Sequence, residues 1–307
     1  CLAGVHDYGL HPAGDFWTTA PLPVPETLEG ALKAASSPGK VALVMMTNAG
    51  ELDLVDNFLC SLRMVGINKY LIFATDAPAL TQLRERGYHA WSGRSIVGKG
   101  LDQGDSEFRS KSWKTLVQAK LKVADTVLRA GYHLFFSDVD VVALDNFLPD
   151  LVAPSQKNGQ WLVDWDGHPK SIKEANTGFY FMRAEQDSLD LLTKAFAQQR
   201  KVPSWDDQKI LNAVMPARLK NYMPRPKFSN GCFLRSGAGK SGELRKLGVS
   251  AVHVNCAVSK LMKHKLMCNN GLWFCANVPA GGNPKGAGGK CRVGYGMERF
   301  TKGGEIQ

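Results

Sequence analysis

Short apolar runs with the length of buried strands alternate with helix-length stretches, and this alternation restricts the fold more than any other feature of the chain. The first two runs are KVALVMMTN at residues 40–48 and YLIFATD at residues 70–76. The stretch between them repeats apolar residues at helical spacing and ends at Gly66, which is placed to cap a helix. A second helix, PALTQLRERG, and a short third strand, HAWS, follow. Strands that alternate with helices predict parallel βαβ units and therefore an α/β domain.

Composition divides the chain into three parts. Residues 1–39 contain HPAG, APLPVP and ASSPG, a composition that predicts an irregular arm over the surface. Residues 40–265 carry the pattern of strands and helices, interrupted at residues 93–109 by a polar, Gly-rich segment with the composition of a mobile loop. Residues 266–307 are rich in Cys and Gly, and we expect them to form an extension packed on the same domain.

Length and hydropathy favour a globular protein. The 307 residues are 44% hydrophobic, which is enough for a substantial core. No run reaches the roughly 18 to 20 consecutive apolar residues that a membrane span needs, so we expect no transmembrane segment in this chain. Because the chain begins at Cys1 without an initiator Met or a leader, we interpret it as a processed product or a trimmed fragment, and an anchor outside it stays open.

The charge balance is basic, with a formal net charge of +10. Such a charge can attract nucleic acid, an anionic membrane surface or a phosphorylated small molecule. The sequence contains no zinc spacing and no basic stripe interleaved with aromatic residues, so we expect no nucleic-acid partner. Two interpretations stay open: a diffuse basic surface that keeps the protein in solution, and a pocket for a phosphorylated donor.

The cysteines cluster near the carboxyl end, where five of the seven follow residue 230. No CxxC or Cys/His metal spacing competes for them. The cluster therefore favours disulfides formed in an oxidising compartment over buried thiols, and the odd count leaves one thiol unassigned.

Lys120 lies among apolar residues on a long predicted helix, SKSWKTLVQAKLKVADTVLRAG. The stripe that it interrupts consists of Trp113, Leu116, Val117, Leu121, Ala124, Val127 and Leu128. A lysine at such a position either covers apolar surface with its stem while its ammonium reaches water, or directs the ammonium into an anion site.

The apolar run HLFFSDVDVV at residues 133–142 contains two carboxylates, Asp138 and Asp140. The run follows the long helix, so these residues are expected at the carboxyl end of a strand, the edge at which open α/β sheets bind ligands. The two-residue period of a strand places both side chains on one side, close enough to contact one cation. Carboxylates without partners inside an apolar run cost several kcal/mol, and a divalent metal compensates for that cost. The alternative is that both aspartates cap the following turn.

Two later strands carry further polar residues. QWLVDWDG is predicted to be a strand that ends in Asp164 and Asp166, and GFYFM a strand that begins beside Asn176, Thr177 and Gly178. Small polar residues at such a point either let the backbone approach a ligand closely or form a plain turn.

Two more candidate sites follow in the last third of the domain. SWDDQKILNAVM opens a predicted helix with Ser204 as a candidate N-cap, and it has Asp206 and Asp207 in the first turn, where helix capping alone can explain acids. SAVHVNCAV is predicted to be a late strand, on which His253 is either a core histidine or a third metal ligand beside the two aspartates.

Two families place an Asp-x-Asp motif at the end of an apolar strand. FFSDVDVV resembles the haloacid-dehalogenase phosphatases locally, in which the first Asp is the nucleophile and the second an acid/base. That family carries the motif on its first core strand, whereas here a full βαβ region precedes Asp138, and PSWDDQ has no strand before it.

Most of residues 40–265 resembles a second family, the GT-A glycosyltransferases. The residues from VMMTNAGELDLVDNF to YLIFATD, the DVD, NTGFYF, WDDQKILN and HVNC, followed by lysines, resemble the nucleotide-diphospho-sugar transferases of plants and algae that include extensin arabinosyltransferases and pectin xylosyltransferases. The resemblance implies a GT-A-like, Rossmann-type mixed sheet flanked by helices.

The residue patterns described above and the resemblance together predict roles for individual residues. Residues expected to bind the donor are Thr47, Asn48, Lys120, Asp138 and Lys260; metal ligands are Asp138, Asp140 and His253; catalytic residues are Asp207 and Gln208; and residues for the sugar or acceptor are Asp164, Asn176, Thr177, Gly178 and Trp205. Related retaining transferases follow the histidine with a Gly and a Lys-Pro. HVNCAVSKLMKHK lacks that Gly and Pro, so the lysine for the pyrophosphate stays open among Lys260, Lys263 and Lys265.

The implied chemistry is the transfer of a pentose or hexose from a nucleoside diphosphate donor, expected to be a UDP-sugar, with Mn²⁺ or Mg²⁺ as cofactor. The expected acceptor is a glycan or a glycoprotein, including hydroxyproline-rich ones, in the Golgi lumen or elsewhere in the secretory pathway, with an extracellular location as the alternative. A glycosyltransferase-like domain that binds sugar or protein without transfer is a further alternative.

Overall fold

The structure is a computed structural model that describes residues 25–37, 39–97, 111–152, 161–165, 174–224, 226–235, 243–257 and 259–274. Four groups of sequence predictions lie outside the described residues: those for the arm at residues 1–24, for most of the segment at 93–109, for Asp166, and for the extension beyond residue 274.

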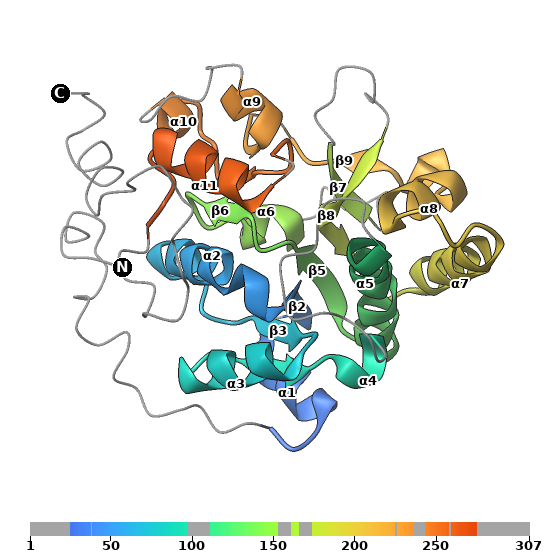
Figure 1. The fold of residues 1–307 in the computed structure, drawn as a ribbon. Helices are drawn as coiled ribbons and strands as arrows, with labels where there is room; N and C mark the ends of the chain where they lie inside the picture. Colours follow the sequence, from blue (N-terminus) through green and yellow to red (C-terminus); the bar gives the residue numbers. More distant parts are fainter. Residues whose placement is uncertain are drawn as a thin grey trace.

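A mixed sheet runs through the molecule in the order β4-β3-β2-β5-β8-β7-β9, with β1 paired to β2 (Figure 1). Its strands are β1 (Ser36–Ser37), β2 (Val41–Thr47), β3 (Leu71–Ala74), β4 (Ala90–Ser92), β5 (His133–Ser137), β7 (Trp161–Trp165), β8 (Ala175–Met182) and β9 (Asn221–Tyr222). Strands β4, β3, β2 and β5 are parallel, and β8 joins β5 antiparallel. The parallel half agrees with the βαβ prediction.

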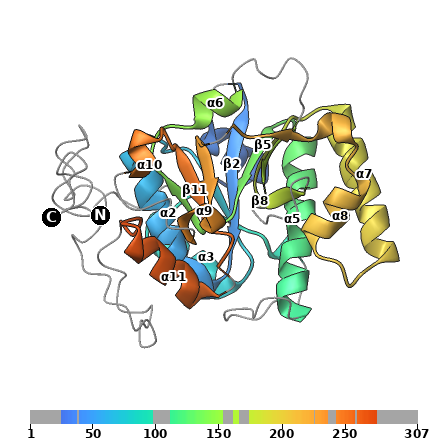
Figure 2. The same cartoon turned by 90° about the horizontal axis from the view of Figure 1, so that it is seen from above.

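Helices cover both faces of the sheet (Figure 2). Alternate residues along β2 explain why: Leu43 and Met45 pack with α2 and α3 on one face, and Ala42 and Val44 pack with α1 and α5 on the other. A strand buried on both faces has no polar positions, which accounts for the continuous apolar runs in the sequence.

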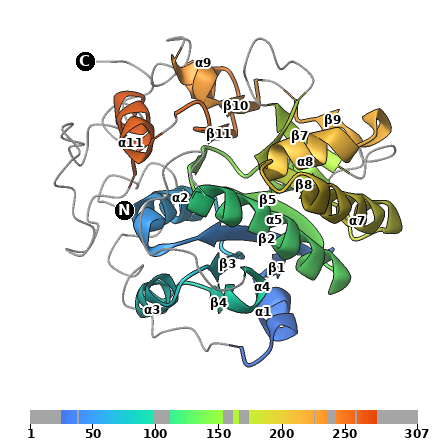
Figure 3. The same ribbon diagram turned by 45° about the vertical axis from the view of Figure 1, so that its right-hand side comes forward.

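The helices pack in two layers. Those on the face of α5 are α1 (Leu28–Ala35), α5 (Lys111–Arg129), α7 (Gln186–Lys201) and α8 (Asp207–Val214), and those on the opposite face include α2 (Leu52–Met64) and α3 (Ala77–Glu85). Helices α5, α7 and α8 pack on one another (Figure 3). Short helices are α4 (Arg94–Val97), α6 (Leu148–Val152), α9 (Gly231–Arg235) and α10 (Glu243–Lys246), and α11 (Lys260–Asn269) is the last described helix. None of the helices in the described ranges is long and apolar enough to cross a bilayer.

A second, three-stranded sheet lies on the α2 face in the order β10-β11-β6. Its strands are β6 (Val141–Ala143), β10 (Phe228–Asn230) and β11 (Ala251–His253). Strand β11 pairs parallel with β10 and antiparallel with β6. The apolar run SAVHVNCAV predicts β11, whereas β10 lies in PRPKFSNGC, which contains no apolar run and predicts no strand.

Three local predictions need correction. Residues 28–35, expected to be part of an irregular arm, form α1, with Thr27 accepting a hydrogen bond from the Gly30 N–H. The N-cap of α8 is Asp206, which accepts from the Lys209 N–H at 2.8 Å, and not Ser204. Strand β8 begins at Ala175, so Asn176 to Gly178 lie inside the strand and not before it.

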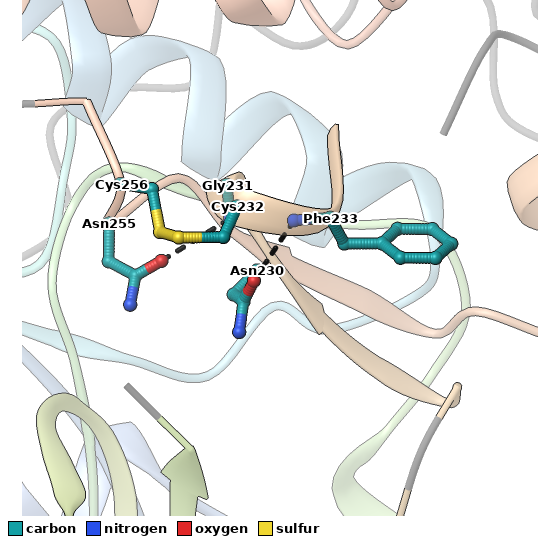
Figure 4. Close-up of a disulfide and its surroundings, with 6 residues drawn as sticks. All are labelled: Asn230, Gly231, Cys232, Phe233, Asn255 and Cys256. Carbon is teal, nitrogen blue, oxygen red and sulfur yellow. Dashed lines mark hydrogen bonds between the residues drawn. A yellow bond between two sulfur atoms is a disulfide. The ribbon is translucent and has the colours of Figure 1, made fainter. Parts of the chain in front are cut away.

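The predicted disulfide chemistry is confirmed. Cys232 in α9 is bonded to Cys256, which follows β11 (Figure 4). The Asn255 side chain accepts a hydrogen bond from the Gly231 N–H at 3.3 Å beside this bond. Cys60 and Cys268 are also disulfide-bonded, and the described part of the chain contains no free cysteine.

Candidate metal centre and its surroundings

Asp138 and Asp140 lie where β5 ends and β6 begins. Strand β5 ends at Ser137, and the Asp138 N–H donates to the Gly178 carbonyl of β8 at 2.5 Å. Val139, between the two aspartates, is 4% exposed and belongs to the core on the α2 face. The two carboxylates lie close together as predicted, but residues 138–140 form a bend between β5 and β6 and are not part of a strand.

His253 reaches the aspartates through the second sheet. In the β11–β6 ladder His253 pairs with Val141, the residue after Asp140, and the Val254 N–H donates to the Asp140 carbonyl at 2.9 Å. The buried imidazole has its Nε2 atom 3.3 Å from Asp140 Oδ1 and 4.0 Å from Asp138 Oδ2. Asp138, Asp140 and His253 thus form a group that could hold a metal ion, with candidate ligand atoms all within 4.8 Å of one another.

The space between these side chains depends on Gly178. A Cβ atom at this position would lie 2.5 Å from His253 Cε1 and would overlap the Asp138 carboxylate. Two carboxylates and an imidazole are a ligand set that suits a divalent ion such as Mn²⁺ or Mg²⁺. The residues present therefore fit the cofactor that the sequence implies.

Each aspartate also contacts a lysine. Lys120 Nζ lies 2.6 Å from Asp138 Oδ1, and Lys263 Nζ lies 3.0 Å from Asp140 Oδ2. Burial alone would raise the pKa of Asp140, but the ammonium of Lys263 and the imidazole of His253 hold the pKa below its ordinary value. Burial would likewise lower the pKa of Lys120, and the neighbouring carboxylates of Asp138 and Asp207 raise it instead. Lys120 therefore directs its ammonium into the site, and the alternative in which it reaches water is wrong.

Asp207 begins α8 and lies close to Lys120 and Asp138. The side chain is buried, and Oδ2 accepts no hydrogen bond from the described residues. Burial raises the pKa of Asp207 to about 6, against the opposing effects of Lys120 and of a hydrogen bond with Thr177. A buried carboxylate of this kind costs stability, and such groups concentrate at functional sites.

Gln208 connects α8 to the first residues of β8. Its Oε1 atom accepts from Asn176 Nδ2 at 3.3 Å and from the Thr177 N–H at 3.4 Å. Asn176 Oδ1 in turn accepts from the Gly178 N–H at 2.7 Å. The structure thus joins Asn176, Thr177, Gly178 and Gln208 in one network beside the aspartates.

The structure distinguishes among the three lysines proposed for the pyrophosphate. Lys263 contacts Asp140, whereas the Lys260 ammonium lies 3.0 Å from Asp53 and also donates to the Gly50 carbonyl. Lys265 is exposed. Lys263, and not Lys260, is therefore the lysine that α11 brings to the metal ligands.

Thr47 is the last residue of β2, and Asn48 comes directly after it. Because β2 is parallel to its neighbour β5, both residues lie at the same edge of the sheet as Asp138. The Thr47 carbonyl accepts from the N–H and the hydroxyl of Thr75, and Asn48 Oδ1 accepts from the Gly50 N–H at 2.9 Å. This hydrogen bond caps a 3₁₀ turn, Ala49–Glu51.

Trp205 packs partly buried against the core on the α5 face, and its carbonyl accepts from Gln118 Nε2 at 2.5 Å. Asp164 lies in β7, where its backbone is paired with Asn176.

Glu51 is a residue of the site that sequence reasoning missed. Its pKa is raised by burial, opposed by Lys263 and reinforced by Asp140 and Asp138, so the carboxyl lies near these groups. An acid in a polar stretch before a helix carries no signal of its own in the sequence, because helix N-termini commonly hold acids.

Comparison with known proteins identifies relatives over most of this region. Residues 65–267 match the family model described as nucleotide-diphospho-sugar transferase. β-Arabinofuranosyltransferase RAY1 of Arabidopsis thaliana is 24% identical over 183 residues, which cover 58% of this chain and 33% of RAY1. Arabinosyltransferase RRA2 of the same plant is 25% identical over 254 residues, covering 72% of this chain and 58% of RRA2. The chain thus spans about a third of one curated relative and just over half of the other.

A solved structure supports the fold. The crystal structure of an active-site mutant of LgtC has a TM-score of 0.50 at 11% sequence identity, covering 78% of this chain and 98% of that chain. A likeness at this identity concerns the fold alone, and it agrees with the GT-A-like arrangement that the sequence predicts.

Proposed function

The chain belongs to the nucleotide-diphospho-sugar transferase family, and on this premise we propose that it is a metal-dependent glycosyltransferase that moves a pentose or hexose from a UDP-sugar to a glycan or glycoprotein. The observation that carries the proposal is the group formed by Asp138, Asp140 and His253, which lies at the carboxyl end of β5 with a lysine on each carboxylate. The arabinosyltransferase names of the relatives favour a pentose, and hydroxyproline-rich acceptors belong to the same proposal.

The residues of the site can stabilise the negative charge of a nucleoside diphosphate as it leaves the sugar. Asp138, Asp140 and His253 would hold Mn²⁺ or Mg²⁺, which when bound neutralises negative charge on the leaving diphosphate. Lys120 and Lys263 present ammonium groups to Asp138 and Asp140, respectively, and these groups can donate to phosphate oxygens. With the leaving group stabilised in this way, the chain needs no general acid at the bond that breaks.

We propose that Asp207 and Gln208 lie near the anomeric carbon of the donor sugar. The carboxylate of Asp207 lies beside Lys120 and Asp138, and a buried negative charge there would stabilise positive charge that develops at the anomeric carbon. Gln208 is held by Asn176 and Thr177, so its amide has a fixed orientation. We propose that transfer retains the configuration of the sugar, as in the retaining transferases that the sequence resembles.

The disulfide between Cys232 and Cys256 supports a location in the secretory pathway, with the Golgi lumen as the proposed compartment and the cell exterior as the alternative. The haloacid-dehalogenase interpretation has no support in the structure, because the aspartates follow the fourth strand of the parallel half of the sheet. The family model that matches the residues around them is that of the nucleotide-diphospho-sugar transferases.

The experiment that tests the proposal is a screen of UDP-sugars for hydrolysis and for transfer to glycan and hydroxyproline-containing acceptors, with Mn²⁺ present. We expect turnover of at least one pentose or hexose donor, and its loss in Asp140→Asn. Asp145→Asn is the matched control, because it makes the same change at an exposed aspartate that follows β6. A folded wild-type protein that binds UDP without turning over any donor would be a binding protein, and phosphate release from a generic phosphatase substrate would contradict the proposal.

A further inference from the structure

His253 is the last residue of β11, a strand of three residues. Its backbone pairs with Val141 of β6 on one side and with Asn230 of β10 on the other. The buried imidazole lies beside the Phe179 ring, with ring centroids 6.4 Å apart. A metal ligand must be held within about 0.5 Å of its working position, whereas the ends of short elements open most readily. His253 therefore needs support beyond the strand ladder itself.

A disulfide lies directly beyond this strand end. Cys256 follows His253 by three residues, and Cys232 follows Asn230, the β10 partner of His253, by two. The Cα atoms of the two cysteines are 5.1 Å apart. The disulfide thus joins the two segments where the β10–β11 ladder ends, and it continues their connection past His253.

Two further contacts hold the same two segments together (Figure 4). The Gly231 N–H donates to Asn255 Oδ1 at 3.3 Å. A Cβ atom on Gly231 would lie 3.0 Å from the Cys256 nitrogen and 3.1 Å from the Val254 carbonyl carbon, so the two backbones approach as closely as a glycine permits. We call the disulfide Cys232–Cys256, Gly231 and Asn255 together the clasp.

The clasp closes a long connection. Strands β10 and β11 are parallel, so the chain cannot return between them by a tight turn and passes through residues 231–250 instead. On the side of β6, the Val254 N–H donates to the Asp140 carbonyl at 2.9 Å, and on the side of β10 the clasp holds the chain after His253. Asp138 is held by β8, through the Gly178 carbonyl. Movement of the end of β11 away from β10 would therefore displace His253 relative to the aspartates.

We propose that the clasp is a positioning element of the metal centre, which holds the His253 imidazole where it can share a cation with Asp138 and Asp140. The inference rests on the proposed function, because it takes these three residues as metal ligands. Loss of groups that orient a metal ligand commonly lowers metal affinity by about 10- to 100-fold. Loss of the clasp should therefore weaken Mn²⁺ binding by about tenfold in a protein that is still folded.

The test measures Mn²⁺ affinity by calorimetry in the absence of nucleotide. The double substitution Cys232→Ser with Cys256→Ser removes the disulfide without leaving a single unpaired thiol, and it should produce the full weakening. Gly231→Ala keeps the disulfide but presses on the backbone of residues 254–256, so it should weaken binding in the same direction to a smaller extent. Circular dichroism shows whether each variant is folded, and Gly231→Ala keeps the test open if the double variant is not.

A matched control separates positioning from a general loss of stability. Leu32→Ala removes a fully buried side chain from α1, in the core on the α5 face, and is expected to destabilise the fold about as much as loss of a disulfide. Its Mn²⁺ affinity should equal that of the wild type.

NMR of metal-free protein with ¹⁵N-labelled histidine gives a second readout. The ring signal of His253, assigned with His253→Ala, should shift or broaden in the double cysteine variant, because the imidazole is no longer held in one position. The signals of His89, which precedes β4, and His133, which begins β5, should stay unchanged, since both lie at the opposite ends of their strands from the site.

The outcomes separate the inference from the function on which it rests. If the wild type does not bind Mn²⁺, the proposed function fails and the inference fails with it. If the wild type binds Mn²⁺ and the folded clasp variants bind it equally well, the inference alone is overturned. Equal weakening in Leu32→Ala, or an unchanged His253 signal in the double variant, would also overturn it, because the disulfide would then act only on overall stability.

Discussion

The substitution Asp207→Asn should stabilise the metal-free protein at neutral pH while it removes activity. Asp207 is 3% exposed, and burial raises its pKa from an ordinary value of 3.8 to about 6 in the folded state. The protonated form is therefore favoured by folding. Above both pKa values the ionised carboxylate costs about 3 kcal/mol, at about 1.4 kcal/mol per pH unit of difference.

The sign of this linkage fixes the pH window. Below pH 3.8 the group is protonated in both states and contributes nothing to the difference. As the pH rises from 3.8 to about 6, the unfolded chain releases its proton first, so the folded state loses stability progressively. An asparagine does not titrate, so the variant lacks this loss. The substitution also removes an acid from the first turn of α8, which costs about 0.3–1 kcal/mol, and leaves a net gain of roughly 2 kcal/mol at pH 8.

Urea unfolding followed by circular dichroism, with a chelator present and from pH 4 to pH 8, measures the difference. The gain should be near zero at pH 4, reach about 2 kcal/mol by pH 7 and raise the melting temperature by about 4–8 °C. Asp206→Asn is the matched control, because Asn caps a helix about as well as Asp, so stability should change little at any pH. A gain in Asp207→Asn that does not depend on pH, or a loss at pH 8, would refute the reasoning.

Three further predictions concern the site and its supports. Gly178→Ala should weaken Mn²⁺ binding by at least about tenfold, because its Cβ would lie 2.5 Å from His253 Cε1; unchanged affinity by calorimetry would contradict the proposed position of the metal. Asn57→Ala should cost about 2–4 kcal/mol in urea unfolding, since the buried amide bonds to the backbone of residues 272 and 274 and both backbone groups would lose their partner. Cys232→Ala should cost about 3 kcal/mol by removing a bridge across 24 residues, and a variant as stable as the wild type would show that the bridge carries no stability.

The regular elements of the fold were predictable because they depend on local pattern. Strands buried on both faces appear as continuous apolar runs, and α2 and α3 appear as amphipathic repeats followed by glycines. Gly66 and Gly87 have positive φ values of 78° and 72°, as expected for residues that end helices. The elements that escaped prediction include α1, which Pro, Gly and Ser in the surrounding residues obscured, and β10, which lies in PRPKFSNGC, where no apolar run indicates a strand.

The aspartate pair was predictable for a related reason. Asp138 and Asp140 interrupt an apolar run, and charged groups are retained in such a place only when something compensates for their burial. The spacing of two residues then predicted that both carboxylates lie close together, as they do. Sequence alone therefore determined that this strand end carries a site.

What surrounds the aspartates was decided by tertiary structure. His253 reaches Asp140 because β11 pairs with β6 in a register that places it opposite Val141, and no local pattern encodes a register between strands so far apart in sequence. Local pattern likewise does not show that Lys263, and not Lys260, contacts Asp140, because this contact depends on how α11 packs beside Asp140. Local pattern also does not show that Glu51 belongs to the site, because its charged neighbours come from three other segments of the chain. Periodicity acts along the chain and fixes which face a residue occupies, whereas contacts between distant segments depend on how whole elements pack.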